Sequence, residues 1–95
     1  MPKLVVISAQ VESFVRALAP EPRRRVRRSL ETLAKGQGDI RALEEELEGY
    51  HRLRIGRYRV IFRYSDDGAI LCVFIETRAL VYQLFASVRD LLEEL

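Results

Sequence analysis

The sequence has a single cysteine and no long apolar run, and these two absences exclude several classes of protein. Cys72 lies inside a short apolar run, so neither a disulfide framework nor a cysteine-ligated metal site is expected. No apolar run approaches the roughly 20 residues that are needed to cross a bilayer. The N-terminus, residues 1–10, has one lysine and a short apolar run, which is too little for a signal peptide. These features predict a cytoplasmic protein that does not enter the membrane.

Repeats, low-complexity stretches and linkers are also lacking. The chain has 95 residues, 48% hydrophobic and 32% charged, a composition that is typical of globular proteins. A single domain over residues 1–95 is therefore expected. The core of so small a domain is marginal by itself, so a folded partner or an oligomer would be a natural source of additional stability.

Positive charge is abundant, although the net charge is only +2. All but two of the 16 Lys and Arg residues are arginine, and they gather in residues 23–28 and 52–63. The acidic residues gather elsewhere, in residues 44–48 and at Glu93 and Glu94. Such segregation produces a strongly positive surface. Arginine suits bidentate contacts with phosphate and stacking on bases. A solvated helix face explains the first cluster well, so the second cluster is the more informative one.

Hydrophobic periodicity and turn residues predict the order β-α-α-β-β-β-α. The expected elements are a strand at 4–7, a helix capped by Ser8, a second helix that starts near Pro22 and ends at Gly36, strands at 50–55, 58–64 and 69–75, and a helix from about Leu80. Residues 40–49 are interpreted as a connector with one helical turn at most. The last helix is expected to present an apolar stripe of Leu84, Val88, Leu91 and Leu92. The fold class is therefore α+β, with a two-helix hairpin and a C-terminal helix packed on a small, antiparallel-rich sheet.

Residues 50–64 alternate in polarity on both sides of Gly56-Arg57, which can form a two-residue hairpin turn with glycine first. That turn places Arg54 opposite Arg59 and Arg52 opposite Ile61, with Arg63 near Tyr50 on the same face. Like charges directly opposite each other destabilise a sheet by up to roughly 1 kcal/mol, so the arginines need an anionic partner. Two partners remain open. One is a phosphate backbone; the other is a carboxylate from residues 44–48 or 93–94, in the same chain or in a second subunit.

Two segments resemble the RelE/ParE toxin superfamily. Residues 47–62, Leu-Glu-Gly-Tyr-His-Arg-Leu-Arg-Ile-Gly-Arg-Tyr-Arg-Val-Ile-Phe, are similar to the family segment LxGYxRLRVGxYRVIY. Residues 75–82, Ile-Glu-Thr-Arg-Ala-Leu-Val-Tyr, are similar to the family ending VxHRxxVY, which is a weaker match. The likeness extends more loosely over the entire chain.

The resemblance implies a function and a set of partners. RelE-like toxins enter the A site of the ribosome and cut mRNA without a metal ion or cofactor, by attack of a ribose 2′-OH on the adjacent phosphate. The expected protein is thus an endoribonuclease that inhibits translation. A cognate antitoxin neutralises such toxins by covering them with an extended or helical segment. Either a homo-oligomer or a toxin–antitoxin hetero-oligomer is compatible with this.

The resemblance also implies which residues act. The catalytic residues carried over from the family motifs are Arg52, Arg54, Arg59, Arg78 and Tyr82. Arginine is effectively always protonated, so these arginines are expected to hold the scissile phosphate and to stabilise the charge that develops on it. Tyr82 is expected to stack on a base or to take part in proton transfer. The residues expected to bind RNA are Arg52, Arg54, Arg59 and Arg63.

One position departs from the family pattern. Thr77 stands where many relatives have histidine, so a ready general acid is lacking. Glu76 is a substitute for it in proton transfer. The sole histidine, His51, is expected on the opposite, helix-covered face in a structural role. The main alternative is a ParE-like toxin, which inhibits DNA gyrase by protein contact and has no catalytic set. Only Arg78 and Tyr82 discriminate against it, and an inactive binding module of the same fold is a further alternative.

Overall fold

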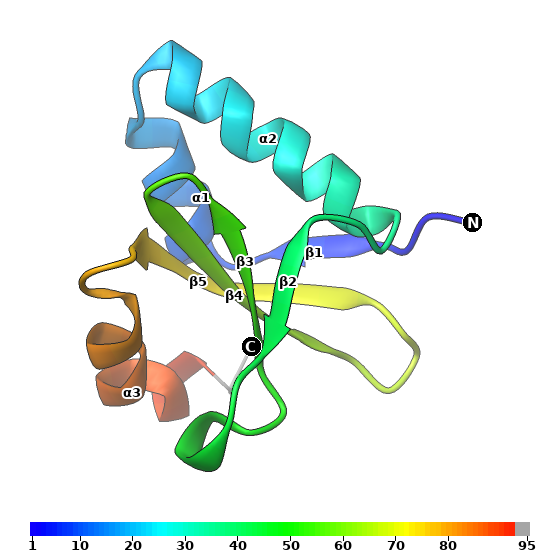
Figure 1. Ribbon diagram of the computed structural model, residues 1–95, viewed down its shortest axis with the longest axis vertical. Helices are drawn as coiled ribbons and strands as arrows, with labels where there is room; N and C mark the ends of the chain where they lie inside the picture. Colours follow the sequence, from blue (N-terminus) through cyan, green and yellow to red (C-terminus); the bar gives the residue numbers. More distant parts are fainter. Residues whose placement is uncertain (93–95) are drawn as a thin grey trace.

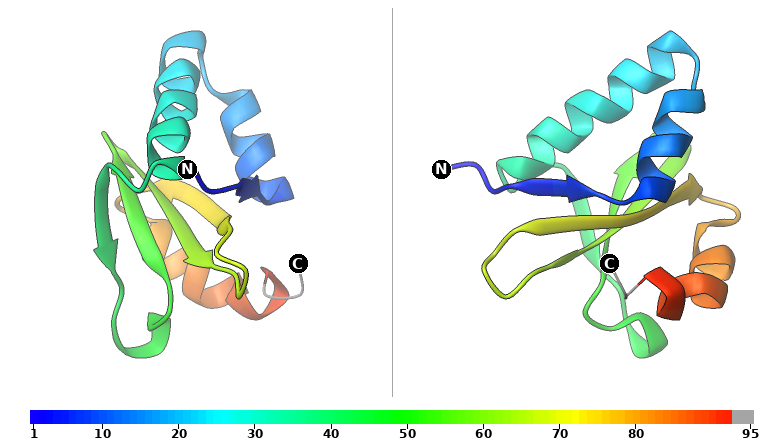
Figure 2. Two further views of the ribbon diagram at one scale, coloured as in Figure 1. Left: turned by 90° about the vertical axis from the view of Figure 1, so that its right-hand side faces the viewer. Right: turned by 180° about the vertical axis from the view of Figure 1, so that it is seen from behind.

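The structure, a computed structural model, describes residues 1–92 and contains within them one five-stranded sheet of order β1-β5-β4-β3-β2 (Figure 1). The strands are β1 (Val5–Ile7), β2 (Asp39–Ala42), β3 (His51–Ile55), β4 (Tyr58–Tyr64) and β5 (Ile70–Thr77), and the helices are α1 (Ala9–Ala17), α2 (Pro20–Ala34) and α3 (Val81–Leu92). Strand β1 is parallel to β5, and the other neighbouring strands are antiparallel. Helices α1 and α2 lie on one face of the sheet and α3 lies on the other (Figure 2). No helix within residues 1–92 combines the length and the apolar character that crossing a membrane requires.

The predicted α+β class and order of elements are confirmed, and the structure adds one strand. The connector predicted at residues 40–49 is wrong at its start, because β2 pairs with β3 from Asp39–Arg54 to Ala42–His51. This strand has only four residues, and only Ile40 among them is half-buried. It therefore shows no alternation that a sequence pattern can detect. The helical turn predicted in this segment is present as a 3₁₀ turn at Glu45–Leu47.

Helix α1 begins where the sequence predicts, at Ser8. The Ser8 Oγ accepts a hydrogen bond from the Val11 N–H (3.2 Å) and donates one to the Val73 carbonyl (2.9 Å), so a single hydroxyl caps the helix and ties it to β5. Two residues later, Gln10 donates to the Ile75 carbonyl (2.7 Å) and accepts from the Ile75 N–H (2.9 Å). Because β1 pairs with β5 only as far as Cys72, the Gln10 amide continues the edge pairing beyond the end of β1.

Each face of the sheet has its own core. The first core lies under α1 and α2 and is made of Val11, Val15, Val26, Leu33, Leu53, Ile55, Val60, Phe62, Ile70, Cys72 and Ile75. The second lies under α3 and is made of Tyr50, Ile61, Val73, Phe74, Val81 and Phe85. A bulge in β5 supplies two adjacent residues to the second core, because Ile61 pairs with Phe74 while Phe62 pairs with Cys72. Burial raises the pKa of the Cys72 thiol to about 12, so this thiol stays protonated and packs as a small apolar side chain.

The buried stripe of α3 differs from the prediction. Val81 and Phe85 are fully buried and Val88 packs against them, whereas the exposed fractions of Leu84 and Leu91 are 39% and 71%. The side chain of Leu92 lies outside the described part of the chain. Both stripes have the i, i+4, i+7 spacing of an amphipathic helix. The choice between them depends on the direction in which the chain enters α3 from β5, and periodicity does not contain that information.

Candidate active site

The β3–β4 hairpin has the predicted register. Arg54 pairs with Arg59 and Arg52 pairs with Ile61, and the turn lies at Gly56-Arg57. Gly56 has a φ of 57°, a left-handed conformation that glycine adopts without steric cost. Cross-strand partners point to the same side of a sheet, so Arg52, Arg54 and Arg59 share the face on which α3 packs.

Arg59 is a buried cation. Its exposed fraction is 8%, and its Nη1 donates to the carbonyl oxygens of Gly56 (2.8 Å) and Tyr58 (2.9 Å). Desolvation lowers the pKa of the guanidinium, and the charge of nearby Arg54 lowers it further. Arginine nevertheless remains protonated at neutral pH. Within residues 1–92 Arg59 forms no ion pair. A buried charge without a counter-ion is unfavourable, so Arg59 is well suited to receive an anion.

Three other arginines and one tyrosine act electrostatically on Arg59. The charges of Arg54, Arg52 and Arg78 lower its pKa, and Tyr82 raises it. We call the group Arg52, Arg54, Arg59, Arg78 and Tyr82 the arginine patch. It brings together β3, β4, the β5–α3 turn and the first turn of α3. The Arg78 N–H donates to the Arg57 carbonyl (2.8 Å), which fixes the β5–α3 turn against the hairpin turn.

Asp39 on β2 is an acidic partner of the patch that the sequence analysis missed. Arg52 Nη1 donates to Asp39 Oδ1 (2.9 Å) and to the Asp39 carbonyl (2.8 Å), and Arg54 Nη1 lies 3.9 Å from Asp39 Oδ2. The hydrogen bond from Arg52, aided by the charges of Arg52 and Arg54, lowers the pKa of the Asp39 carboxyl. The alternative that residues 44–48 pair with these arginines inside one chain is wrong within residues 1–92, and their pairing between subunits stays a prediction. Glu93 and Glu94 lie outside the described residues. Asp39 thus partly neutralises one edge of the patch and leaves Arg59 and Arg78 unpaired within residues 1–92.

Arg63 lies apart from the patch. It lines a shallow hollow with Glu48, Gly49 and Tyr50, as the predicted position near Tyr50 requires. Its charge is not among those that shift the pKa of Arg59. A ligand that contacts both Arg63 and Arg59 would therefore have to extend along β4.

His51 and Glu76 take different places relative to the patch. His51 is on the opposite face, as predicted, where its ring stacks on Phe62 (centroids 5.3 Å apart, planes at 20°) and meets the edge of Tyr64 (5.2 Å). Glu76 is the cross-strand partner of Arg59 on β5, and its Oε2 accepts a hydrogen bond from the Thr77 N–H (2.7 Å). It is therefore a neighbour of Arg59 across the strands, and its carboxylate forms no ion pair with Arg59 or Arg78 within residues 1–92.

The chemistry of the patch follows from its donors. Guanidinium groups bind phosphate oxygens through paired N–H groups, and a tyrosine ring offers a stacking surface for a base. Within residues 1–92, no cluster of three or more His, Cys, Asp or Glu side chains is placed to hold a metal ion. The arrangement suits a nucleic-acid backbone that presents one phosphate to Arg59 and Arg78 and its neighbours to Arg52 and Arg54.

Neither a family model nor a curated protein matches the sequence, but solved structures match the fold. The toxin–antitoxin complex RelBE2 from Mycobacterium tuberculosis aligns with a TM-score of 0.70 at 20% identity, over 83% of this chain and 94% of that one. The RelE–RelB complex from the archaeon Pyrococcus horikoshii aligns with a TM-score of 0.67 at 26% identity, over 82% and 97%. YafQ from Escherichia coli aligns with a TM-score of 0.60 at 12% identity, over 81% and 94%. The chain has the fold of RelE-like toxins, which confirms the resemblance found in residues 47–62 and 75–82.

Proposed function

We propose that this chain is the toxin of a toxin–antitoxin pair and that it cuts mRNA on the ribosome through the arginine patch. The observation that carries the proposal is Arg59, a buried guanidinium that forms no ion pair within residues 1–92 and is surrounded by further arginines and Tyr82. The fold, shared with RelE-like toxins over most of the chain, supports it. The protein would act in the cytoplasm, where ribosomes translate mRNA.

The proposed reaction is an in-line attack of a ribose 2′-OH on the adjacent phosphorus. The bond from the 2′-oxygen to phosphorus forms, the bond from phosphorus to the 5′-oxygen breaks, and the proton of the 2′-OH is removed while one is delivered to the leaving oxygen. Arg59 and Arg78 would stabilise the additional negative charge on the phosphate oxygens. Tyr82 would stack on a base and hold the nucleotide in line, which is itself a large contribution to the rate. Arg52 and Arg54 would bind neighbouring phosphates.

Proton transfer needs a group other than arginine. Thr77 occupies the place of the histidine that is common among relatives, and its hydroxyl is a poor general acid. Glu76 lies beside Arg59 in the sheet register and is the carboxylate that we assign to this task. The phenol of Tyr82 is the second group of the patch that can exchange a proton.

The experiment that tests the function is cleavage of mRNA on purified ribosomes, with the cut positions mapped by primer extension. A gyrase supercoiling assay on the same preparation tests the main alternative. The proposal requires cuts in ribosome-bound mRNA and unchanged supercoiling. Inhibited supercoiling together with intact mRNA would reject the ribonuclease and leave the patch as a protein-binding surface.

The proposed partner is a cognate antitoxin with an acidic and hydrophobic binding segment. The similar solved structures RelBE2 and RelE–RelB are complexes of two proteins, and RelBE2 is described as a toxin–antitoxin complex. Exposed apolar side chains on this chain lie at the start of α3 and in the turn before it (Leu84 and Leu80) and at the edge strand β1 (Val6 and Ile7). Such surfaces commonly mark interfaces. We expect co-expression with the adjacent gene product to abolish toxicity. A partner at about 1,000 times its Kd stabilises the folded state by about 4 kcal/mol, which differential scanning calorimetry detects as a raised Tm. An unchanged Tm with every neighbouring gene product would contradict the pairing.

The Asp39 contact gives a test of RNA binding by the patch. Asp39→Asn keeps a hydrogen-bond acceptor for Arg52 but removes the negative charge, so we expect tighter binding of a short single-stranded RNA. The salt dependence of log K should steepen by up to about 0.7 for each additional arginine that engages a phosphate. Fluorescence anisotropy over a KCl series measures both quantities. Asp66→Asn removes the same charge from the exposed β4–β5 turn and serves as the control; equal effects of the two substitutions would count against binding at the patch.

A further inference from the structure

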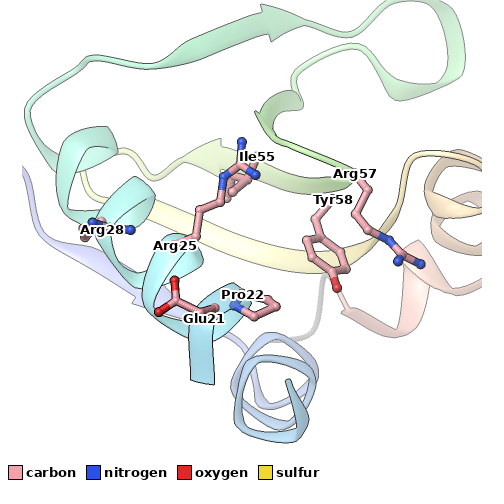
Figure 3. A pocket seen from close by; sticks show the side chains of 7 residues that line it. All are labelled: Glu21, Pro22, Arg25, Arg28, Ile55, Arg57 and Tyr58. Atoms are coloured by element: carbon pink, nitrogen blue, oxygen red, sulfur yellow. The ribbon is translucent and has the colours of Figure 1, made fainter. Parts of the chain in front are cut away.

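A second basic site lies on the other face of the sheet, between α2 and the hairpin. A hollow of about 350 Å³ is lined by Glu21, Pro22, Arg25 and Arg28 of α2, by Ile55 of β3, and by Arg57 and Tyr58 (Figure 3). Pockets that bind small molecules commonly have volumes of about 300–1,000 Å³. Ile55 and Tyr58 belong to the core under α1 and α2, so this hollow is separated from the arginine patch by the sheet itself.

The charges around the hollow are unbalanced. Within residues 1–92 no ion pair involves Arg25 or Arg28, whereas Glu21, the acidic residue of the lining, contacts Arg24 on its own helix. Two guanidinium groups that line one cavity give it a positive potential, which favours an anion. Both side chains are exposed, as expected for a solvated helix face, and they also line this concave surface.

Arg25 is held in place by the hairpin turn. A Cβ atom added to Gly56 would lie 2.7 Å from Arg25 Nη1, so the guanidinium packs directly over a position that has no side chain. In Figure 3, Arg25 reaches from α2 toward the Ile55 end of the hairpin, and the ring of Tyr58 stands on the other side of the hollow. A guanidinium that is already positioned loses less conformational entropy when it binds a ligand.

The wall opposite Arg25 is aromatic and apolar. The Tyr58 ring is half-buried and meets the edge of Phe14 (centroids 5.7 Å apart, planes at 82°), which fixes its orientation. Pro22 and Ile55 add apolar surface. On this side Arg57 lies over the ring, with its Cζ 5.6 Å from the ring centroid. The hollow therefore offers cationic donors together with a flat aromatic surface, a combination that suits a ligand with a phosphate and a planar ring system.

We propose that this hollow binds a nucleoside monophosphate unit, with its phosphate on Arg25 and Arg28 and its base against Tyr58. The unit is either a free nucleotide or a nucleotide that is exposed in an RNA strand; the chemistry is the same. A carboxylate side chain of an acidic peptide would satisfy the arginines but would make no use of the aromatic surface of Tyr58. This site is independent of cleavage at the arginine patch and goes beyond the proposed function.

The experiment is isothermal titration calorimetry of the full chain with AMP, with ribose 5-phosphate, with inorganic phosphate and with a short single-stranded RNA. Arg25→Ala removes a charge-assisted contact and should weaken AMP binding about tenfold or more. Arg27→Ala removes the same charge from the same helix but faces a different hollow, with Glu12, Arg16 and Leu30, so it should have little effect. Glu21→Gln removes a repulsive carboxylate and should strengthen binding, which is a change of opposite sign.

The base-binding role of Tyr58 has its own variants. Tyr58→Phe keeps the ring and should retain the affinity for AMP, whereas Tyr58→Leu should reduce it to that of ribose 5-phosphate. A thermal melt of each variant shows whether it is folded. Arg59→Ala should leave AMP binding intact, so failure of this site and failure of the ribonuclease proposal are distinguishable.

The titrations, with competition by an acidic peptide as a further arm, decide the proposal. AMP binding that responds to Arg25 and not to Arg27 supports a free nucleotide as the ligand. The same response with RNA alone assigns the site to a nucleotide within a strand. Equal loss in Arg25→Ala and Arg27→Ala, affinity for inorganic phosphate equal to that for AMP, or displacement of AMP by an acidic peptide at lower concentration overturns it.

Discussion

Replacing Arg59 with alanine is expected to lower the rate of mRNA cleavage on ribosomes by about 10²–10³-fold, or roughly 3–4 kcal/mol of transition-state stabilisation. Arg59 is buried and already oriented by the carbonyls of Gly56 and Tyr58. Its remaining N–H groups can therefore meet a developing charge without reorganisation, in surroundings where electrostatic interactions are strong. Arg78→Ala is expected to have an effect of the same kind, because it acts on the same phosphate in the proposed reaction.

Lysine at position 59 should rescue the activity only in part. Lysine keeps the positive charge but lacks the planar fork, and with the two carbonyls of the hairpin turn bound, its ammonium has only one N–H left for a phosphate. Arg24→Ala and Arg57→Ala are the matched controls, because both remove an exposed arginine outside the patch. Single-turnover cleavage on ribosomes measures the rate, and a thermal melt shows that each variant is folded. Equal rates for Arg59→Ala and Arg24→Ala would remove Arg59 from the mechanism.

The sequence predicted the hairpin part of the site, because that part depends on a local alternation of polar and apolar residues. The register of Arg52, Arg54 and Arg59 follows from alternation on both sides of one glycine-first turn, and all the residues involved lie within 14 positions of one another, from His51 to Tyr64. Once the turn sets the register, each side chain of the hairpin is assigned to one face of the sheet. The position of His51 on the opposite face follows from the same parity.

The parts that the sequence did not predict depend on contacts between distant segments. Asp39 reaches Arg52 only because a four-residue edge strand forms beside β3, and so short a strand has no detectable periodicity. The hollow between Arg25 and Tyr58 forms only when α2 packs on the hairpin. These two residues are more than 30 positions apart in the sequence. Neither the Asp39–Arg52 contact nor the hollow can be recognised from the sequence pattern of a single segment.

The attachment of α3 is the clearest case in which periodicity allowed two answers, and it carries a large expected effect on stability. Phe85 is fully buried, and its ring centroid lies 5.0 Å from that of Tyr50 and 5.8 Å from that of Phe74. The contact with Tyr50 is edge-to-face and the contact with Phe74 is tilted, and aromatic pairs add to the free energy of burial. The second core is small, so no neighbouring side chain can fill the space that Phe85 occupies. The position of Tyr82, one helical turn earlier, depends on this attachment.

Phe85→Ala is therefore expected to lower the free energy of unfolding by about 3–5 kcal/mol, a large share of the roughly 5–15 kcal/mol that is typical of a domain. Leu84→Ala changes the adjacent residue, which is 39% exposed and belongs to the stripe that the sequence pattern favoured. Because its side chain is absent from the core under α3, its replacement should cost no more than about 0.5–1 kcal/mol. Urea denaturation followed by circular dichroism measures both. Equal losses, or a larger loss for Leu84→Ala, would mean that α3 packs through the predicted stripe. In that case Tyr82 would no longer face Arg59, and the arginine patch would lose its aromatic member.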